Sequence, residues 1–251
     1  MIKKLTTLSA LALAFASVPA LAQSGHIGGV YASNSDIDFD VWGVEGSSSY
    51  NLNDSVSVKV DGGLASYDDG FDSNLGWRLN GHIFYNAGDF RIGAVAGTAQ
   101  LDSSGNNPTA SHWGLEGQYW FDRVAVSGSA TWGSTDWIIS PNIDFSNYDI
   151  SADFYATNNL VIGATYGVGS ADNGATDADT TNYAIDAEWK FDNSPVSVVG
   201  GFNHWEIQDT PVQSEAWTIG VRWNWGEDLK ARDHADFRHS AQGLIGRFIG
   251  F

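Results

Sequence analysis

Several residue types and patterns are scarce in this chain of 251 residues. It has no cysteine, five prolines and one methionine, and its 12 Lys and Arg face 30 Asp and Glu. Without cysteine, neither disulfides nor thiolate metal sites are available. The formal charge is −18 at pH 7, and we expect no nucleic-acid partner for so acidic a chain.

Long hydrophobic runs are also missing after the first 22 residues. No later stretch approaches the ~18 consecutive apolar residues that a membrane-spanning helix needs. If the exported chain lies in a membrane, it must therefore cross as a closed barrel, because only helices and closed barrels satisfy their backbone groups in lipid.

The first 22 residues have the three parts of a secretory signal. Lys3 and Lys4 give a positive start, an apolar run over 8–15 follows, and Ala20-Leu21-Ala22 provides an A-x-A cleavage site. We predict that residues 1–22 are a signal peptide; the alternative is a buried N-terminal helix.

An aromatic repeat with a period of 34 to 36 residues runs through the rest of the chain. Its leading residues are Trp42, Trp77, Trp113, Tyr148, Tyr183 and Trp217. Eight positions after five of them stand Tyr50, Tyr85, Phe121, Phe191 and Trp225; the fourth repeat has Ala156 there, with Phe154 two residues before it. A fixed period determines the architecture, and this one predicts six two-stranded hairpins.

Within each repeat, apolar and polar residues alternate. In 217–225, for example, Trp217, Ile219 and Val221 alternate with polar or small residues, which predicts a strand. The strands of a soluble β-sandwich would show the same alternation, so the spacing of the aromatics must distinguish a sandwich from a membrane barrel. Eight residues span ~26 Å of strand, or ~20 Å at a ~40° tilt, close to the ~25 Å apolar band between the aromatic girdles of outer-membrane barrels.

The predicted fold class is all-β: a transmembrane antiparallel up-and-down β-barrel of about 12 strands. Six less aromatic strands are expected near 25–33, 55–66, 89–100, 123–133, 159–170 and 195–206. Tight turns rich in Asn, Asp and Gly alternate with longer acidic connections, including 67–73, 101–109, 134–146, 171–180 and 207–214. This predicts short periplasmic turns and longer acidic extracellular loops. The barrel covers 23–226, and 227–251 form a periplasmic C-terminal tail.

The parity of the alternation also predicts which charged side chains face the lumen. The candidate pore-lining residues are Glu45, Lys59, Asp61, Arg78, His82, Arg91, Glu116, Asp149, Asp153, Asp186, Glu188, Lys190 and Arg222. Small residues on the alternate strands favour a wet interior; the alternative is that these charges pair and fill the barrel as a polar core. Seven acids against five bases, with acidic loops, predict a weak cation preference.

Four large aromatics are candidates for a constriction. Phe84, Trp120 and Tyr155 face inward near the periplasmic end, and Trp137 lies in the apolar part of the expected loop 134–146. As a hypothesis, the apolar end of the tail docks against the first three, so that deleting 227–251 should raise conductance. The alternative is a disordered tail that assembly factors recognise.

These features resemble the porin-like outer-membrane proteins of Gram-negative bacteria. The resemblance rests on the signal, the aromatic-girdled alternating strands and the stretch Gly220-Val221-Arg222-Trp223-Asn224-Trp225. It implies passive diffusion of small hydrophilic solutes or ions, with outer-membrane lipid, lipopolysaccharide and the barrel-assembly machinery as partners. It also allows a homo-oligomer, and it brings no catalytic residue, cofactor or metal. One departure is the 26-residue tail after the last strand.

Two other functions remain open from the sequence. One is a non-conducting structural or adhesion barrel, and the other is an outer-membrane hydrolase. Ser111-His112 and Asn203-His204 are adjacent pairs, but neighbours in a strand point to opposite faces and cannot act as a nucleophile and its base. We therefore expect no enzyme.

Overall fold

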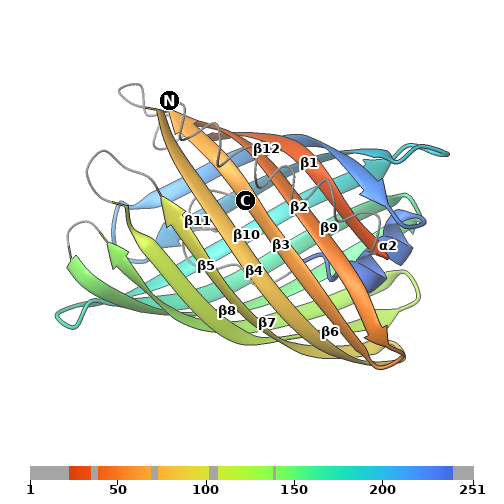
Figure 1. Cartoon of the computed structure of the whole chain (residues 1–251). Helices are drawn as coiled ribbons and strands as arrows, with labels where there is room; N and C mark the ends of the chain where they lie inside the picture. Colours follow the sequence, from red (N-terminus) through yellow and green to blue (C-terminus); the bar gives the residue numbers. More distant parts are fainter. Residues whose placement is uncertain (1–22, 35–38, 69–72, 102–106, 138–139, 240–251) are drawn as a thin grey trace.

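A computed structural model describes residues 23–34, 39–68, 73–101, 107–137 and 140–239 (Figure 1). Twelve antiparallel strands form one closed barrel in which each strand pairs with its neighbours in sequence and β1 pairs with β12. The strands are β1 Ser24–Asn34, β2 Phe39–Asn53, β3 Val56–Asp68, β4 Ser73–Ala87, β5 Phe90–Leu101, β6 Thr109–Phe121, β7 Val124–Trp137, β8 Ser140–Thr157, β9 Leu160–Asp172, β10 Asp177–Lys190, β11 Val196–Ile207 and β12 Gln213–Trp225. The predicted fold class is confirmed.

The closing seam shows that β12 is the last strand of the barrel. It pairs with β1 from Gly25 opposite Trp225 to Asn34 opposite Ala216. The seam is therefore complete before the tail begins, as expected from an even strand count.

The strands extend further at the loop end than the sequence pattern predicted. β7 continues to Trp137 and β8 begins at Ser140, so most of the expected loop 134–146 is strand. The alternation persists there, because Thr135 and Phe145 are buried. The backbone of Trp137 pairs with Ser140, but its side chain lies outside the described part of the structure, so its proposed role in a constriction has no structural account.

The outer wall of the barrel is apolar and exposed. Trp42 and Trp217 are each 65% exposed and Trp113 is 61% exposed, and the other predicted girdle residues are exposed or half-buried. Rings from the alternate strands extend the girdle: Tyr31 lies 4.5 Å from Trp42, and Trp132 lies 5.0 Å from Trp113. Such a belt fits the interface between lipid and water.

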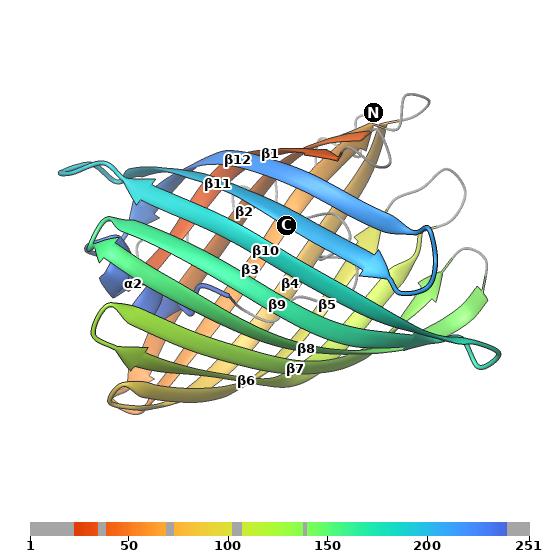
Figure 2. The same ribbon diagram turned by 180° about the vertical axis from the view of Figure 1, so that it is seen from behind.

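The remaining element is a short helix, α2 (Leu229–Asp236). Gly226 has a φ of +102°, a conformation that glycine adopts easily, and the chain changes direction there. Asp228 caps the helix by accepting a hydrogen bond from the backbone N–H of Ala231 at 2.8 Å. Figures 1 and 2 show α2 at the end of the barrel where the short turns lie, which in such barrels is the periplasmic end. No helix of the described residues has the length and hydropathy of a membrane span.

Candidate functional site

The predicted inward-facing charges do lie on the inner side of the barrel wall. Glu45, Lys59, Asp61, Arg78, His82, Arg91, Glu116, Asp153 and Glu188 are buried, and Asp149, Asp186, Lys190 and Arg222 are half-buried. Most of them form hydrogen bonds or ion pairs with one another or with residues 227–239.

One polar network centres on Asp61 of β3. Its carboxylate accepts hydrogen bonds from Arg78 at 3.3 Å and from Asn80 at 2.9 Å, and it lies 2.7 Å from His82. The other ring nitrogen of His82 lies 2.6 Å from Glu116. These residues come from β3, β4 and β6, so antiparallel pairing of neighbouring strands brings them together.

A second cluster centres on Arg222 of β12. Its guanidinium donates to Glu45 at 2.7 Å and to Glu188 at 2.7 Å. Glu188 also accepts a 2.6 Å hydrogen bond from Ser197. Arg222 therefore joins β2 to β10 across the seam region.

The tail docks against the inner wall through polar contacts. Arg232 of α2 donates two hydrogen bonds to Glu188, at 2.7 and 2.9 Å, the paired geometry that guanidinium and carboxylate groups favour. Asp236 accepts hydrogen bonds from Ser47 and from Ser49 of β2. Two wall cations bind tail carbonyls: Lys59 donates to Phe237 at 2.9 Å, and Arg91 donates to His234 at 2.6 Å.

Three of the predicted constriction residues contact the tail. The ring of Phe237 stacks on Phe84 at 5.4 Å, and His234 lies 5.0 Å from Trp120. The Tyr155 hydroxyl donates to Asp233 at 3.0 Å. These aromatics thus contact the segment Leu229–Phe237. The apolar residues of 244–251, which were expected to dock there, lie outside the described residues, so that hypothesis stays a prediction.

Beyond α2, the chain makes further contacts with β8 and β10. Arg238 pairs with Asp186 of β10 and lies 3.5 Å from Asp153 of β8. His239 lies 2.8 Å from Asp153. Residues 227–239, which we call the plug, therefore contact strands around the barrel, including β2, β3, β5, β8 and β10.

Burial changes the titration of two plug residues. Burial and the nearby anions Glu188 and Asp153 raise the pKa of Asp233 to about 6, although the guanidinium of Arg232 opposes the shift. Partial desolvation and Arg91 lower the pKa of His234. The plug therefore carries a carboxyl group that titrates near neutral pH.

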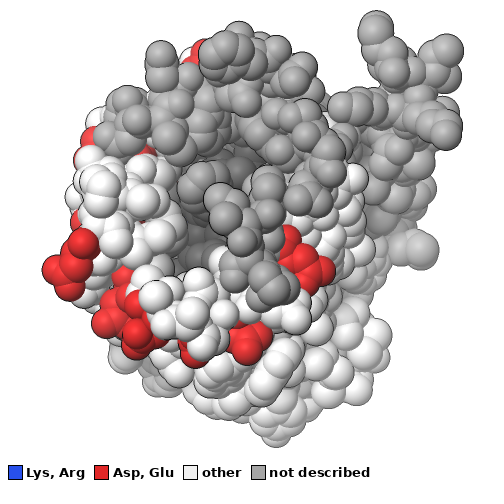
Figure 3. Space-filling view, turned by 90° about the vertical axis from the view of Figure 1, so that its left-hand side faces the viewer, with Lys and Arg blue, Asp and Glu red and all other residues white. Residues whose placement is uncertain are grey.

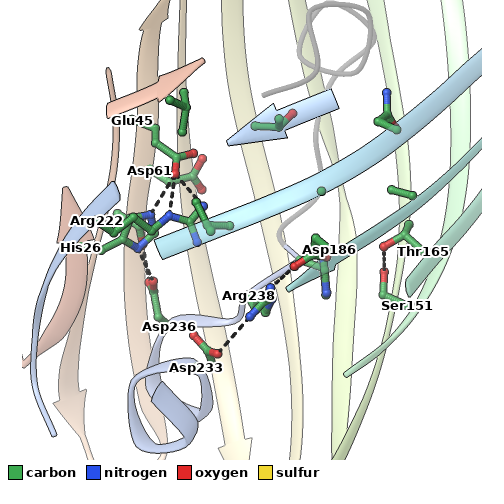
Figure 4. Close-up of a pocket in the computed structure, with 18 of the residues that line it drawn as sticks. His26, Glu45, Asp61, Ser151, Thr165, Asp186, Arg222, Asp233, Asp236 and Arg238 are labelled. Atoms are coloured by element: carbon green, nitrogen blue, oxygen red, sulfur yellow. Dashed lines mark hydrogen bonds and ion pairs between the residues drawn. The ribbon is translucent and has the colours of Figure 1, made fainter. Parts of the chain in front are cut away.

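A cavity of about 260 Å³, with many charged side chains in its lining, lies beside the plug inside the barrel. Its lining includes five plug side chains, Arg232, Asp233, Asp236, Arg238 and His239. It also includes seven predicted pore residues: Glu45, Lys59, Asp61, Arg78, Asp149, Asp186 and Arg222. Figure 4 shows Arg238 at this cavity, joined to Asp186 and to Asp233. The plug thus closes the cavity toward the turn end.

The far end of the barrel is acidic. Figure 3 looks onto this end, where Asp and Glu side chains lie around a central hollow. Exposed acids there include Asp136, Asp172, Asp177 and Asp179. The six connections at this end carry no Lys or Arg in the sequence, so nothing basic in them offsets this charge.

The functional residues that sequence reasoning missed all belong to the plug: Arg232, Asp233, Asp236, Arg238 and His239. Their signal was the balance of acids and bases in the tail, but a short polar segment does not reveal where it binds. The wall aromatics were a better guide, because large inward side chains need a covering partner.

Four of the described histidines, His26, His82, His204 and His239, lie beside carboxylates. His82 lies between Asp61 and Glu116, and His204 lies 3.3 Å from Glu215 and 3.4 Å from Glu206. Among the residues that the structure describes, no three His, Asp or Glu side chains are arranged to hold a metal ion.

Comparison with known proteins identifies the fold. No protein-family model matches the sequence, and no curated protein sequence matches it. Among solved structures, the chain resembles the COG4313 outer membrane channel from Pseudomonas putida F1, with a TM-score of 0.61, 14% identity, and coverage of 81% of this chain and 96% of that one.

Two further structures are similar. One is the translocator domain of autotransporter NalP from Neisseria meningitidis, with a TM-score of 0.53, 12% identity, and coverage of 89% and 98%. The other is the KdgM porin, with a TM-score of 0.51, 11% identity, and coverage of 80% and 99%. Together with the closed barrel and its exposed apolar belt, these likenesses identify the fold as that of an outer-membrane β-barrel.

Proposed function

We propose that this protein is an outer-membrane channel for passive diffusion of small hydrophilic solutes, with a weak preference for cations, and that the plug holds it closed. The observation that carries the proposal is the cavity beside the plug, whose lining includes many charged side chains. A barrel whose inner space is lined by charged and hydroxyl groups is suited to hydrated solutes.

The nature of the plug contacts supports a reversible closure. Arg232, Asp236 and Arg238 reach the wall through hydrogen bonds and ion pairs, and water can replace such contacts when a segment moves out. The apolar part consists of two side chains: Leu229 packs with Trp120, Ala125, Tyr155 and Val161, and Phe237 stacks on Phe84. Displacement of the plug would open the periplasmic end.

The cation preference follows from the distribution of charge. Solutes entering from outside meet the acidic rim first, and a rim of one sign raises the local concentration of counter-ions. Carboxylate rings favour cations in pores. The wall cations lie deeper and are bound to wall carboxylates or to the plug.

Single-channel recording of the refolded full-length protein in planar bilayers tests the proposal. We compare the wild type with Arg232→Gln, which removes the paired hydrogen bonds to Glu188, and with Lys230→Gln as a matched control, because Lys230 on the same helix only reaches the exposed Asp122 at 3.4 Å. We expect rare openings for the wild type and for Lys230→Gln, and at least a tenfold higher open probability for Arg232→Gln. Reversal potentials in a KCl gradient should favour K⁺; a preference for Cl⁻ would reject the selectivity.

A non-conducting structural barrel is the second candidate. The observation that favours it is the completeness of the ion-pair network, in which Arg222, Glu188 and Arg232 link the wall to the plug. Silent bilayers for both the wild type and Arg232→Gln, with correct folding shown by heat-modified gel mobility, would favour this candidate over the channel.

A further inference from the structure

The inner wall has two sides that differ in how their carboxylates are neutralised. On the first side, wall residues neutralise one another: Asp61 binds Arg78 and His82, and Glu45 binds Arg222. These contacts do not involve the plug, so this side keeps its pairing whether the plug is present or not.

The second side consists of β8, β9 and β10. Two of its carboxylates, Asp153 and Asp186, depend on the plug for their ion pairs, whereas Glu188 also binds Arg222 of the wall. Among the described residues, the ion pairs of Asp153 and Asp186 are all with Arg238 or His239. Asp153 is 1% exposed, and its Oδ2 has no hydrogen-bond partner in the described part of the chain. A buried carboxylate left without a cation is costly; this side therefore needs a cation from elsewhere when the plug is absent.

The local sequence makes room for that cation. Gly163 of β9 lies between Asp153 and Asp186, and a Cβ there would come within 2.7 Å of one carboxylate, 2.8 Å of the other and 3.1 Å of His239. Glycine thus lets two carboxylates from β8 and β10 converge on one group. With Glu188 alongside, three acidic side chains surround the guanidinium groups of Arg232 and Arg238.

The groups that these carboxylates bind are guanidinium groups. Arg232 engages Glu188 with two parallel hydrogen bonds, and Arg238 spans Asp153, Asp186 and Asp233. A planar guanidinium with several donors suits such a spread of carboxylates better than a compact ammonium group does. Asp186 and Arg238 also line the cavity (Figure 4), so a solute in the cavity can contact this place.

We propose that Asp153, Asp186 and Glu188 form a binding site for a guanidinium-bearing solute of the size of arginine, and that the plug occupies it as a tethered ligand. The solute and the plug then compete for the same carboxylates. Transport of such a solute rests on the proposed channel function, but its binding does not.

Calorimetric titration of the full-length protein in detergent micelles tests the site. The Arg238→Ala variant removes the occupant that faces the cavity, and L-arginine is the ligand. L-citrulline is the matched control, because it has the same shape with an uncharged ureido group. We expect Arg238→Ala to bind L-arginine at least tenfold more tightly than the wild type does, and L-citrulline at least tenfold more weakly than L-arginine.

Substitutions of the carboxylates identify the site. Adding Asp186→Asn to Arg238→Ala should weaken L-arginine binding at least tenfold, whereas adding Asp54→Asn, an exposed carboxylate in the turn between β2 and β3, should leave it unchanged. If Arg238→Ala does not fold, Arg238→Gln replaces it, since it also lacks the guanidinium. Equal binding of arginine and citrulline, or binding that survives Asp186→Asn, would overturn the site.

Conductance is recorded separately so that the two proposals can fail independently. Arginine-specific binding in a silent barrel would keep the site and reject the channel. Conductance without arginine-specific binding would keep the channel and reject the site.

Discussion

Asp233 is the plug residue whose protonation near neutral pH affects docking. It is 1% exposed, faces Tyr155, Arg232 and Arg238, and lies near the anions Glu188 and Asp153. Its pKa is about 6 when docked, against 3.8 for a free aspartate. The docked state therefore binds the proton of Asp233 more tightly than the released state does. Protonated Asp233 stabilises docking fully below pH 3.8, and this stabilisation is lost as the pH rises through 6.

The resulting prediction is that plug release increases between pH 5 and pH 7. We expect the open probability in bilayers to be higher at pH 7 than at pH 5. His234 acts in the opposite sense, because its lowered pKa disfavours docking of the protonated ring. The measurement is therefore made in a His234→Gln background, and Asp233→Asn should flatten the pH dependence there; an unchanged slope would contradict the assignment.

Gly163 supports a second prediction at the residue scale. Gly163→Ala places a methyl group against Asp153 and Asp186, and such overpacking costs about 1–3 kcal/mol. We expect weaker docking of the plug, measured as faster proteolysis of the tail in folded protein. Gly81→Ala is the matched control, because a Cβ at Gly81 meets nothing within 4 Å. Equal proteolysis of both variants would show that the carboxylates adapt to the methyl group.

At the scale of elements, α2 depends on one cap and on the wall around it. Its eight residues are too few for an isolated helix to be stable in water. Asp228 accepts from the backbone of Ala231 and from the side chain of Asn158. Replacing a capping aspartate by alanine costs about 0.5–2 kcal/mol.

We therefore expect Asp228→Ala to loosen the plug while the barrel stays folded. Hydrogen exchange of the α2 amides should become about 2- to 30-fold faster if exchange follows local opening, as that free energy implies. Exchange in β1 and β12 should not change. Asp228→Ser, another good cap, should restore slow exchange; if it does not, the contact with Asn158 is the important one.

The strands were predictable as elements, whereas α2 was not. The six alternate strands begin within one residue of the predicted positions and end up to four residues later, because period-two alternation continues past the acidic residues that suggested loops. The inward direction of the site residues followed from the same parity. Helix α2 has no comparable periodic signal, and contacts distant in the sequence, such as that between Arg232 and Glu188, stabilise it.

At the scale of the whole molecule, charge is graded along the barrel axis. The connections of the loop end carry no Lys or Arg, while the cations of the plug and of Lys59, Arg91 and Arg222 lie toward the turn end. A hydrated solute would cross the acidic rim, then the cavity, then the plug. Selectivity at the rim would act through the aqueous phase and should therefore be screened by salt.

We predict that the permeability ratio of K⁺ to Cl⁻ falls as salt rises. The Debye length shrinks from ≈ 10 Å at 0.1 M to about 3 Å at 1 M, so salt screens the attraction of the exposed rim carboxylates for cations. Reversal potentials of the Arg232→Gln channel at both concentrations measure this. Replacing Asp172, Asp177 and Asp179 by Asn should remove most of the salt dependence. If the permeability ratio changes neither with salt nor with these substitutions, the buried carboxylates determine the selectivity instead.

The sequence by itself determined the wall of this protein. Aromatic spacing and alternation specify strand positions, the lipid face and the inward set of charges, because a strand exposes its residues to two environments in strict turn. The tertiary structure alone decided what occupies the inside. Barrel closure and the return of the tail through Gly226 decide how each carboxylate is paired. Some carboxylates bind cations of the wall, and others bind Arg232 or Arg238 of the plug. Those contacts join residues far apart in the chain, and no local pattern encodes them.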